Sequence, residues 1–197
     1  MRSPSLKIKL SFSVILITVS LIFTHSYLSL AAMLAAVFHE LGHIAVARLC
    51  KIPLGELKLG IFGASLSAKP LLCSYKSEII LAGAGPLVNL ISALLLSPLY
   101  GNDFFALFIT ASLFLGILNL LPIYEFDGGR ILYCIIAYHH SQELARRVIF
   151  ALSFVLIFGL WTLSIYLLLR LASSLSLFIF SLSLFSKIFL LPSKDIY

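Results

Sequence analysis

Three residues within one turn of a helix carry the strongest chemical signal in this sequence: His39, Glu40 and His43, in the stretch FHELGH. A helical spacing of four residues points both imidazoles the same way, as two ligands of a tetrahedral zinc ion require. A carboxylate beside the first histidine can reach a water on that metal and act as a general base. Chance produces this HExxH pattern in only about three such sequences per thousand. The pattern therefore predicts a zinc site for hydrolysis, with Glu40 as the base.

A catalytic zinc usually has three protein ligands and one open position, so a third ligand is needed. Asp127 is the preferred candidate, because Pro122 should end a helix shortly before it and the glycines at 128 and 129 relieve backbone crowding after it. The acidic residues Glu78 and Glu125 remain alternatives, although Glu78 is more simply a charge at the membrane interface and Glu125 is expected to face solvent. Asp103 is excluded by topology, since it falls in a turn on the external side.

The composition places these residues in a lipid bilayer. Charged residues make up 11% of the chain and hydrophobic residues 61%, with a mean hydropathy of +1.10. About 20 apolar residues span the hydrocarbon core of a membrane. The sequence thus predicts an all-α polytopic membrane protein of about six transmembrane helices, at residues 10–24, 27–49, 79–100, 104–124, 148–169 and 171–191.

The longest polar interruption, residues 51–76, has apolar residues that partly alternate with polar or small ones around Gly60 and Gly63. This pattern predicts two short strands within residues 54–72, forming a small β-hairpin at the cytosolic membrane surface. An amphipathic loop is the alternative. An open strand edge there could hold an extended peptide by backbone hydrogen bonds.

The basic residues report the orientation of the chain. If the N-terminus is cytosolic, every Lys and Arg except Arg170 falls on the cytosolic side, which is the distribution that the positive-inside rule favours. Six spans then return the C-terminus to the cytosol. The net charge of +6 is dispersed between apolar spans, so we expect no nucleic-acid partner. A cleaved signal peptide is a weaker alternative for the N-terminal stretch, because its apolar character continues into the next span.

Three motifs resemble those of the site-2 protease family of intramembrane zinc metalloproteases: FHELGH at 38–43, AGAGPLVNL at 82–90 and NLLPIYEFDGGR at 119–130. The resemblance covers roughly residues 10–190. It implies a single membrane-embedded protease domain over residues 1–197, with a three-helix catalytic core at about 27–49, 79–100 and 104–124. It also implies Zn²⁺ held by His39, His43 and Asp127, with Glu40 as the catalytic base.

The same resemblance suggests that Asn89 and Asn119 bind the substrate backbone or stabilise an oxyanion. Taken without it, each asparagine is an interhelical hydrogen-bonding residue, a common use of this side chain in membranes. No counterpart of the cystathionine-synthase-type domain found in some members is present in the sequence, so we expect no regulation by ATP in cis.

The expected substrate is a membrane-associated protein, cut by regulated proteolysis. The closest branch of the family points to a sporulation sigma-factor precursor, in a bacterial cell membrane or the membrane surrounding the forespore, with inhibitory membrane proteins as further partners. Other branches point to an anti-sigma factor or a remnant signal peptide. A catalytically silent scaffold and an ion-translocating protein are the competing classes. The intact HExxH with a matching Asp disfavours the scaffold, and the lack of internal repeats disfavours a transporter.

Overall fold

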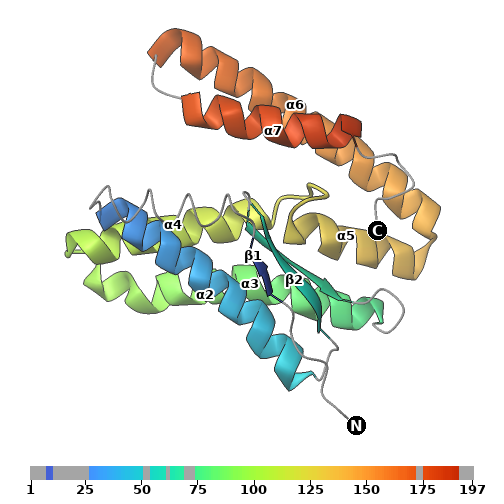
Figure 1. Ribbon diagram of the computed structural model, residues 1–197, viewed down its shortest axis with the longest axis horizontal. Coiled ribbons are helices and arrows are strands. Elements are labelled where there is room, and N and C mark those ends of the chain that lie inside the picture. The colour runs from blue at the N-terminus through green and yellow to red at the C-terminus, as the bar shows by residue number, and fades with distance from the viewer. Residues whose placement is uncertain are drawn as a thin grey trace. The chain divides into compact units, whose positions relative to one another are not determined.

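The structure is a computed structural model that describes residues 8–10, 27–50, 54–60, 63–68, 74–171 and 175–190. The chain divides into two compact units, Met1–Leu120 and Leu121–Tyr197. The described residues form six α-helices and one small sheet, so the chain is mostly helical, as predicted (Figure 1).

Three helices form the body of the first unit, and each packs against the other two. They are α2 (Tyr27–Leu49), α3 (Tyr75–Leu96) and α4 (Asp103–Asn119). The bounds of α2 coincide with the predicted span. Helix α3 begins before the predicted residue 79, because the Ser74 side chain accepts a hydrogen bond from the Ser77 backbone N–H and caps the helix there.

A short turn joins α3 to α4. It contains the 3₁₀-helix η1 (Ser97–Leu99) and Asn102, whose side-chain oxygen accepts hydrogen bonds from the backbone N–H groups of Phe104 and Phe105. Helix α4 ends at Asn119, so the span predicted over 104–124 was too long at its C-terminal end. Pro122 lies in the loop that follows, and the prediction that the helix stops before it is confirmed.

Small residues let α2 approach its neighbours closely. Ala31 and Ala35 are buried with Phe108 of α4 in one apolar cluster. Gly42 faces α3, where a Cβ atom at its position would lie 2.7 Å from the backbone oxygen of Ala84 and 2.9 Å from a methyl carbon of Val88. The two helices therefore touch backbone to backbone, which is how helices associate without a hydrophobic driving force in lipid.

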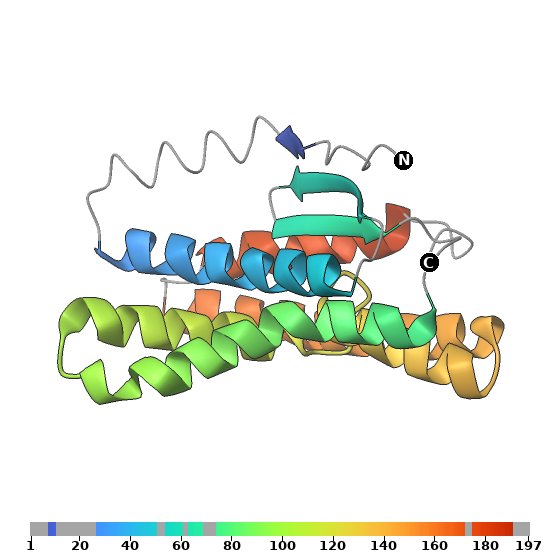
Figure 2. The same cartoon turned by 90° about the horizontal axis from the view of Figure 1, so that it is seen from below.

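The three-stranded sheet also belongs to the first unit. Strands β2 (Leu54–Gly60) and β3 (Gly63–Ala68) form an antiparallel hairpin closed at the pair Gly60–Gly63, and β3 contacts α2 (Figure 2). The predicted hairpin is thus present. Strand β1 (Ile8–Leu10) pairs in parallel with β2 and was not predicted. The predicted span at 10–24 lies outside the described residues except for its first residue, Leu10, which ends β1.

The second unit contains α5 (Asp127–His139), α6 (Gln142–Leu171) and α7 (Leu175–Leu190), with α5 and α7 each packed on α6. The last two helices correspond to the predicted spans at 148–169 and 171–191. Helix α5 was not predicted, because its 13 residues are fewer than the number of apolar residues that span a membrane. The buried hydroxyls of Ser164 and Ser181 lie 3.0 Å apart and join α6 to α7.

Three of the described helical segments are long and apolar enough to cross a membrane: Tyr27–Leu49, Tyr75–Leu99 and Gln142–Arg170. Helix α4 is apolar but has 17 residues, so it reaches about 26 Å at the usual rise of about 1.5 Å per residue. That is slightly less than the hydrocarbon thickness of about 30 Å. The count of six spans and the orientation of the termini stay predictions.

The close contact of α2 with α3 can be tested at Gly42. Gly42→Ala places a methyl group against the Ala84 carbonyl, so we expect a loss of stability of about 1–3 kcal/mol from overpacking. Thermal unfolding in detergent, followed by circular dichroism, measures the loss. The matched control is Gly83→Ala on α3, where an added Cβ meets nothing within 4 Å. Equal melting temperatures for the two variants would contradict the contact.

Candidate metal centre

Helix α2 brings two imidazoles together inside the first unit. His39 and His43 are one turn apart on the helix, and each is 6% exposed. Their Nε2 atoms lie 3.2 Å apart. Nitrogens about 2.0–2.1 Å from a tetrahedral zinc ion are separated by about 3.3 Å, so this spacing is that of two ligands of one ion.

A backbone carbonyl sets the orientation of His43. Its Nδ1 lies 2.8 Å from the oxygen of Leu81 on α3. A carbonyl oxygen can only accept, so Nδ1 carries the hydrogen and Nε2 of the neutral ring presents its lone pair. Two histidines ligating through Nε2 and held from behind through Nδ1 form the usual arrangement of a histidine metal site.

The second ring is also held from behind. Nδ1 of His39 lies 3.3 Å from the side-chain nitrogen of Asn89, a residue of α3 that is completely buried. Both rings therefore contact α3 through Nδ1, and their Nε2 atoms face each other.

Gly85 of α3 leaves the space that an ion would need. A Cβ atom at this position would lie 2.4 Å from Nε2 of His43 and 2.7 Å from Nε2 of His39. Any other residue would thus place a side chain against the Nε2 atoms of both rings. The donor set and the space beside it fit a metal ion such as zinc.

Glu40 follows His39 directly on α2. Its side chain is partly exposed, although its Oε2 atom is buried. Placement beside the first histidine is what a general base needs, because the carboxylate must reach a water at the metal.

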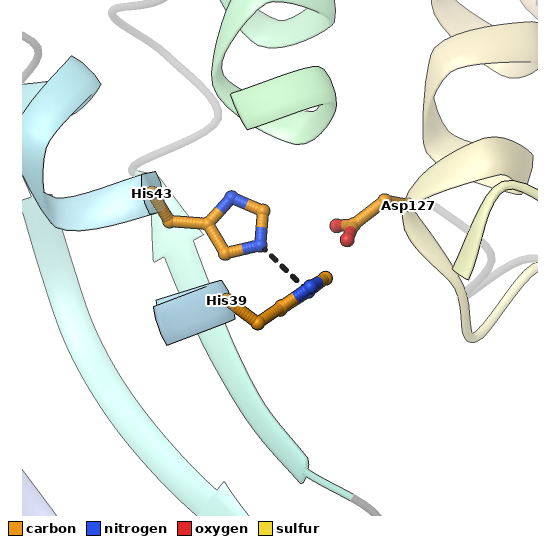
Figure 3. A group of neighbouring side chains, drawn as sticks. All are labelled: His39, His43 and Asp127. Carbon is orange, nitrogen blue, oxygen red and sulfur yellow. Dashed lines mark hydrogen bonds between the residues drawn. The ribbon is translucent and has the colours of Figure 1, made fainter. Parts of the chain in front are cut away.

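Asp127 belongs to the second unit, where it is the first residue of α5 and not the end of the preceding span (Figure 3). A carboxylate in the first turn is favoured there by the exposed N–H groups of the helix. The preceding loop is tightly folded: a Cβ on Gly129 would lie 2.1 Å from the Ile123 carbonyl oxygen. This agrees with the predicted relief of backbone crowding. The Tyr124 N–H donates to the buried hydroxyl of Ser153 at 2.9 Å.

The ligand set named from the sequence is divided between the units: His39 and His43 belong to the first and Asp127 to the second (Figure 3). Figure 3 draws the two histidines with the line that joins their Nε2 atoms.

The other acidic candidates occupy different settings. Glu125 is exposed and accepts a hydrogen bond from the Tyr124 hydroxyl, which agrees with the expectation that it faces solvent. Asp103 is exposed in the first turn of α4, and Glu78 lies in the first turn of α3. Asn119 lies in the last turn of α4, where its side chain donates to the Leu115 carbonyl of the same helix at 3.0 Å.

Three groups that contact the histidines or the loop before Asp127 were not predicted from the sequence. They are the Leu81 carbonyl, the bare Cα of Gly85 and the hydroxyl of Ser153. Gly85 had a signal, because it lies beside Pro86 in the second of the three motifs. Leu81 and Ser153 had none, since a backbone oxygen and a lone serine act here only through tertiary contacts.

A model of one protein family matches part of the chain. Peptidase family M50 matches residues 101–162, which contain Asp127, α4, α5 and the first part of α6.

Two relatives are similar over most of the chain. A zinc metalloprotease of Methanocaldococcus jannaschii is 32% identical over 151 residues, which are 68% of this chain and 43% of the relative. Stage IV sporulation protein FB of Bacillus subtilis is 29% identical over 161 residues, 76% of this chain and 54% of the relative. The chain thus spans about half the length of the curated relatives it matches.

A solved structure shares the fold. The site-2 protease from Methanocaldococcus jannaschii superimposes with a TM-score of 0.66 at 23% identity, covering 95% of this chain and 91% of the other. The three long apolar helices agree with an integral membrane protein. In sequence the chain is thus similar to peptidase family M50, and it shares the fold of a solved site-2 protease.

Proposed function

We propose that this protein is an intramembrane zinc metalloendopeptidase that cuts a membrane-associated protein. The observation that carries the proposal is the pair of buried Nε2 atoms of His39 and His43, spaced 3.2 Å apart beside the bare Cα of Gly85. Ionisable groups are costly inside a membrane and mark function when they occur there. The family and its zinc-metalloprotease relative support the same chemistry.

Asp127 is the third zinc ligand in this proposal. Its support is chemical: a carboxylate with two imidazoles is a common ligand set of catalytic zinc, and it leaves one position open. The Asp-Gly pair at 127–128, following NLLP, also matches the motif whose resemblance suggested it.

Bound zinc polarises a scissile carbonyl and lowers the pKa of a water. Glu40 takes the proton of the attacking water and gives it to the leaving amine, so one carboxylate serves as base and then as acid. His39 and His43 keep their rings fixed through Nδ1, and the site therefore needs no rearrangement of these ligands.

A sporulation sigma-factor precursor is the substrate that we propose, because one relative is a sporulation protein of Bacillus subtilis. The substrate is cut on the cytosolic side and is held extended at the β3 edge of the sheet, because β1 already pairs with β2. Asn119, in the last turn of α4, contacts the backbone of the substrate. An anti-sigma factor and a remnant signal peptide are the other substrates of the same chemistry, and inhibitory membrane proteins are the partners that we expect.

Glu40→Gln tests the base. The variant keeps the ligands, so we expect unchanged zinc content and at least about a 100-fold loss of cleavage. The measurement is cleavage of a tagged sigma-factor precursor co-expressed with the intact protein or the variant, with zinc measured in both by mass spectrometry. Zinc without cleavage by the intact protein would reject this substrate. Absence of zinc from both would reject the site, and equal cleavage by both would reject Glu40 as the base.

Asp127→Asn tests the third ligand. The amide is a poorer ligand than the carboxylate, and we expect zinc affinity to fall by more than about 100-fold, beyond the loss that a residue behind a ligand causes. Competition with a coloured zinc chelator measures the affinity. Glu125→Gln, two residues earlier and exposed, is the matched control and should bind zinc normally. Loss in the control with retention in Asp127→Asn would exchange the roles of the two carboxylates.

Gly85→Ala tests the space beside the histidines. The added methyl group lies 2.4 Å from Nε2 of His43, so we expect at least about a tenfold loss of zinc affinity, although alanine is the better helix former. Gly83→Ala adds the same atom to the same helix in open space and should bind zinc as the intact protein does. Normal zinc binding by Gly85→Ala would show that the ion does not occupy this volume.

A further inference from the structure

The side-chain amide of Asn89 leaves one polar atom without a hydrogen-bond partner and makes a long contact with the other. The residue is completely buried, and its side-chain oxygen Oδ1 has no hydrogen-bond partner. Its side-chain nitrogen Nδ2 instead faces Nδ1 of His39 at 3.3 Å, which is longer than the usual distance of about 2.9–3.0 Å for such a bond. A buried amide oxygen without a partner destabilises the fold, because it loses the hydrogen bonds to water that it makes in the unfolded chain.

The tautomer of His39 decides what Asn89 must do. If Nε2 of His39 gives its lone pair to a metal, the hydrogen of the neutral ring is on Nδ1. Nδ1–H would then face the NH₂ group of Asn89, and two donors would meet.

A rotation of the amide by 180° separates the two donors and gives Oδ1 a partner, while the NH₂ group takes the position in which Oδ1 had none. The nitrogen and oxygen of an asparagine amide have nearly the same size, so the rotated group fits the same space. Oδ1 then faces Nδ1 of His39 and accepts its hydrogen. One change provides the buried oxygen with a partner and separates the two donors.

We propose, resting on the proposed zinc site, that Asn89 is a positioning residue: its Oδ1 accepts a hydrogen bond from Nδ1–H of His39 and fixes the tautomer that ligates through Nε2. Leu81 does the same for His43 with its backbone carbonyl. Helix α3 thus supplies one acceptor behind each histidine, a side-chain oxygen for one and a main-chain oxygen for the other.

This role differs from contact with the substrate. The amide of Asn89 lies behind His39, on the Nδ1 side, and is 0% exposed. An amide that is committed to the ring in this way stabilises no oxyanion in front of Nε2. Asn89 therefore acts through the metal ligand, and its loss should be visible in zinc binding before any substrate is added.

Two substitutions in the full-length protein separate the alternatives. Asn89→Leu has a similar volume and no polar atom, so we expect zinc affinity to fall by about 10–100-fold. Asn89→Asp offers a carboxylate, which can only accept from Nδ1–H, and we expect affinity within about threefold of the intact protein or higher. Ser92→Ala is the control: Ser92 lies on the same helix, and its hydroxyl donates only to the Asn89 main-chain carbonyl.

Zinc affinity is measured by chelator competition, and absorption spectra of the cobalt-substituted proteins report the geometry of the site. Normal zinc binding with lost cleavage in Asn89→Leu would overturn the proposal in favour of an oxyanion role. Equal loss of zinc affinity in Asn89→Asp and Asn89→Leu would show that the amide donates instead of accepting. Thermal unfolding curves check that both variants are folded. Failure of the intact protein to bind zinc would reject the proposed function itself, and the positioning role with it.

Discussion

The distance between α2 and α3 is the constraint on which the rest of the first unit depends. Gly42 lets the backbone of α2 touch the Ala84 carbonyl, and Gly85 leaves room beside α3 for the Nε2 atoms of both histidine rings. A side chain at either glycine would separate the helices or fill the volume beside Nε2. The same closeness brings the Leu81 carbonyl within 2.8 Å of His43. Packing and chemistry at the centre are therefore set by a single helix–helix contact.

Burial of polar groups in an apolar bundle imposes the second condition. Two imidazoles at 6% exposure need partners from the protein, since burial leaves their polar atoms little contact with solvent. The first unit meets this need locally, with groups of α3 that face α2. The second unit meets the same need by a different route, because Ser153 accepts the N–H of Tyr124 in the loop that leads to Asp127. In both units a neighbouring helix pairs a polar group of the segment that carries a proposed ligand.

Much of this could be predicted from the sequence where the signal is local. The HExxH spacing named two candidate ligands and a candidate base, which stay predictions, and Pro122 marked the end of a helix. Helix α5 was missed because it is short, and β1 because the alternation in Ile8–Leu10 covers only three residues, too few to indicate a strand. The motif AGAGPLVNL drew attention to the segment that holds Gly85 and Asn89. Their contacts with the rings could not be predicted, since these depend on how close two helices come. Sequence periodicity places a residue on a face, but it does not measure the gap to the neighbouring helix.

The contacts of α3 behind His39 and His43 also have a thermodynamic consequence. The rings present both lone pairs only while α2 and α3 are paired, so an ion bound there would favour the paired state over the separated one. By linkage, the ion then stabilises the bundle by RT ln(1 + [L]/Kd), about 1.4 kcal/mol for each tenfold excess of free ion over the dissociation constant. The concentration of free zinc would in this way determine the stability of the helix pair as well as its reactivity. A cell poor in zinc would hold a bundle that opens more often, and such a bundle is an easier target for quality-control proteases.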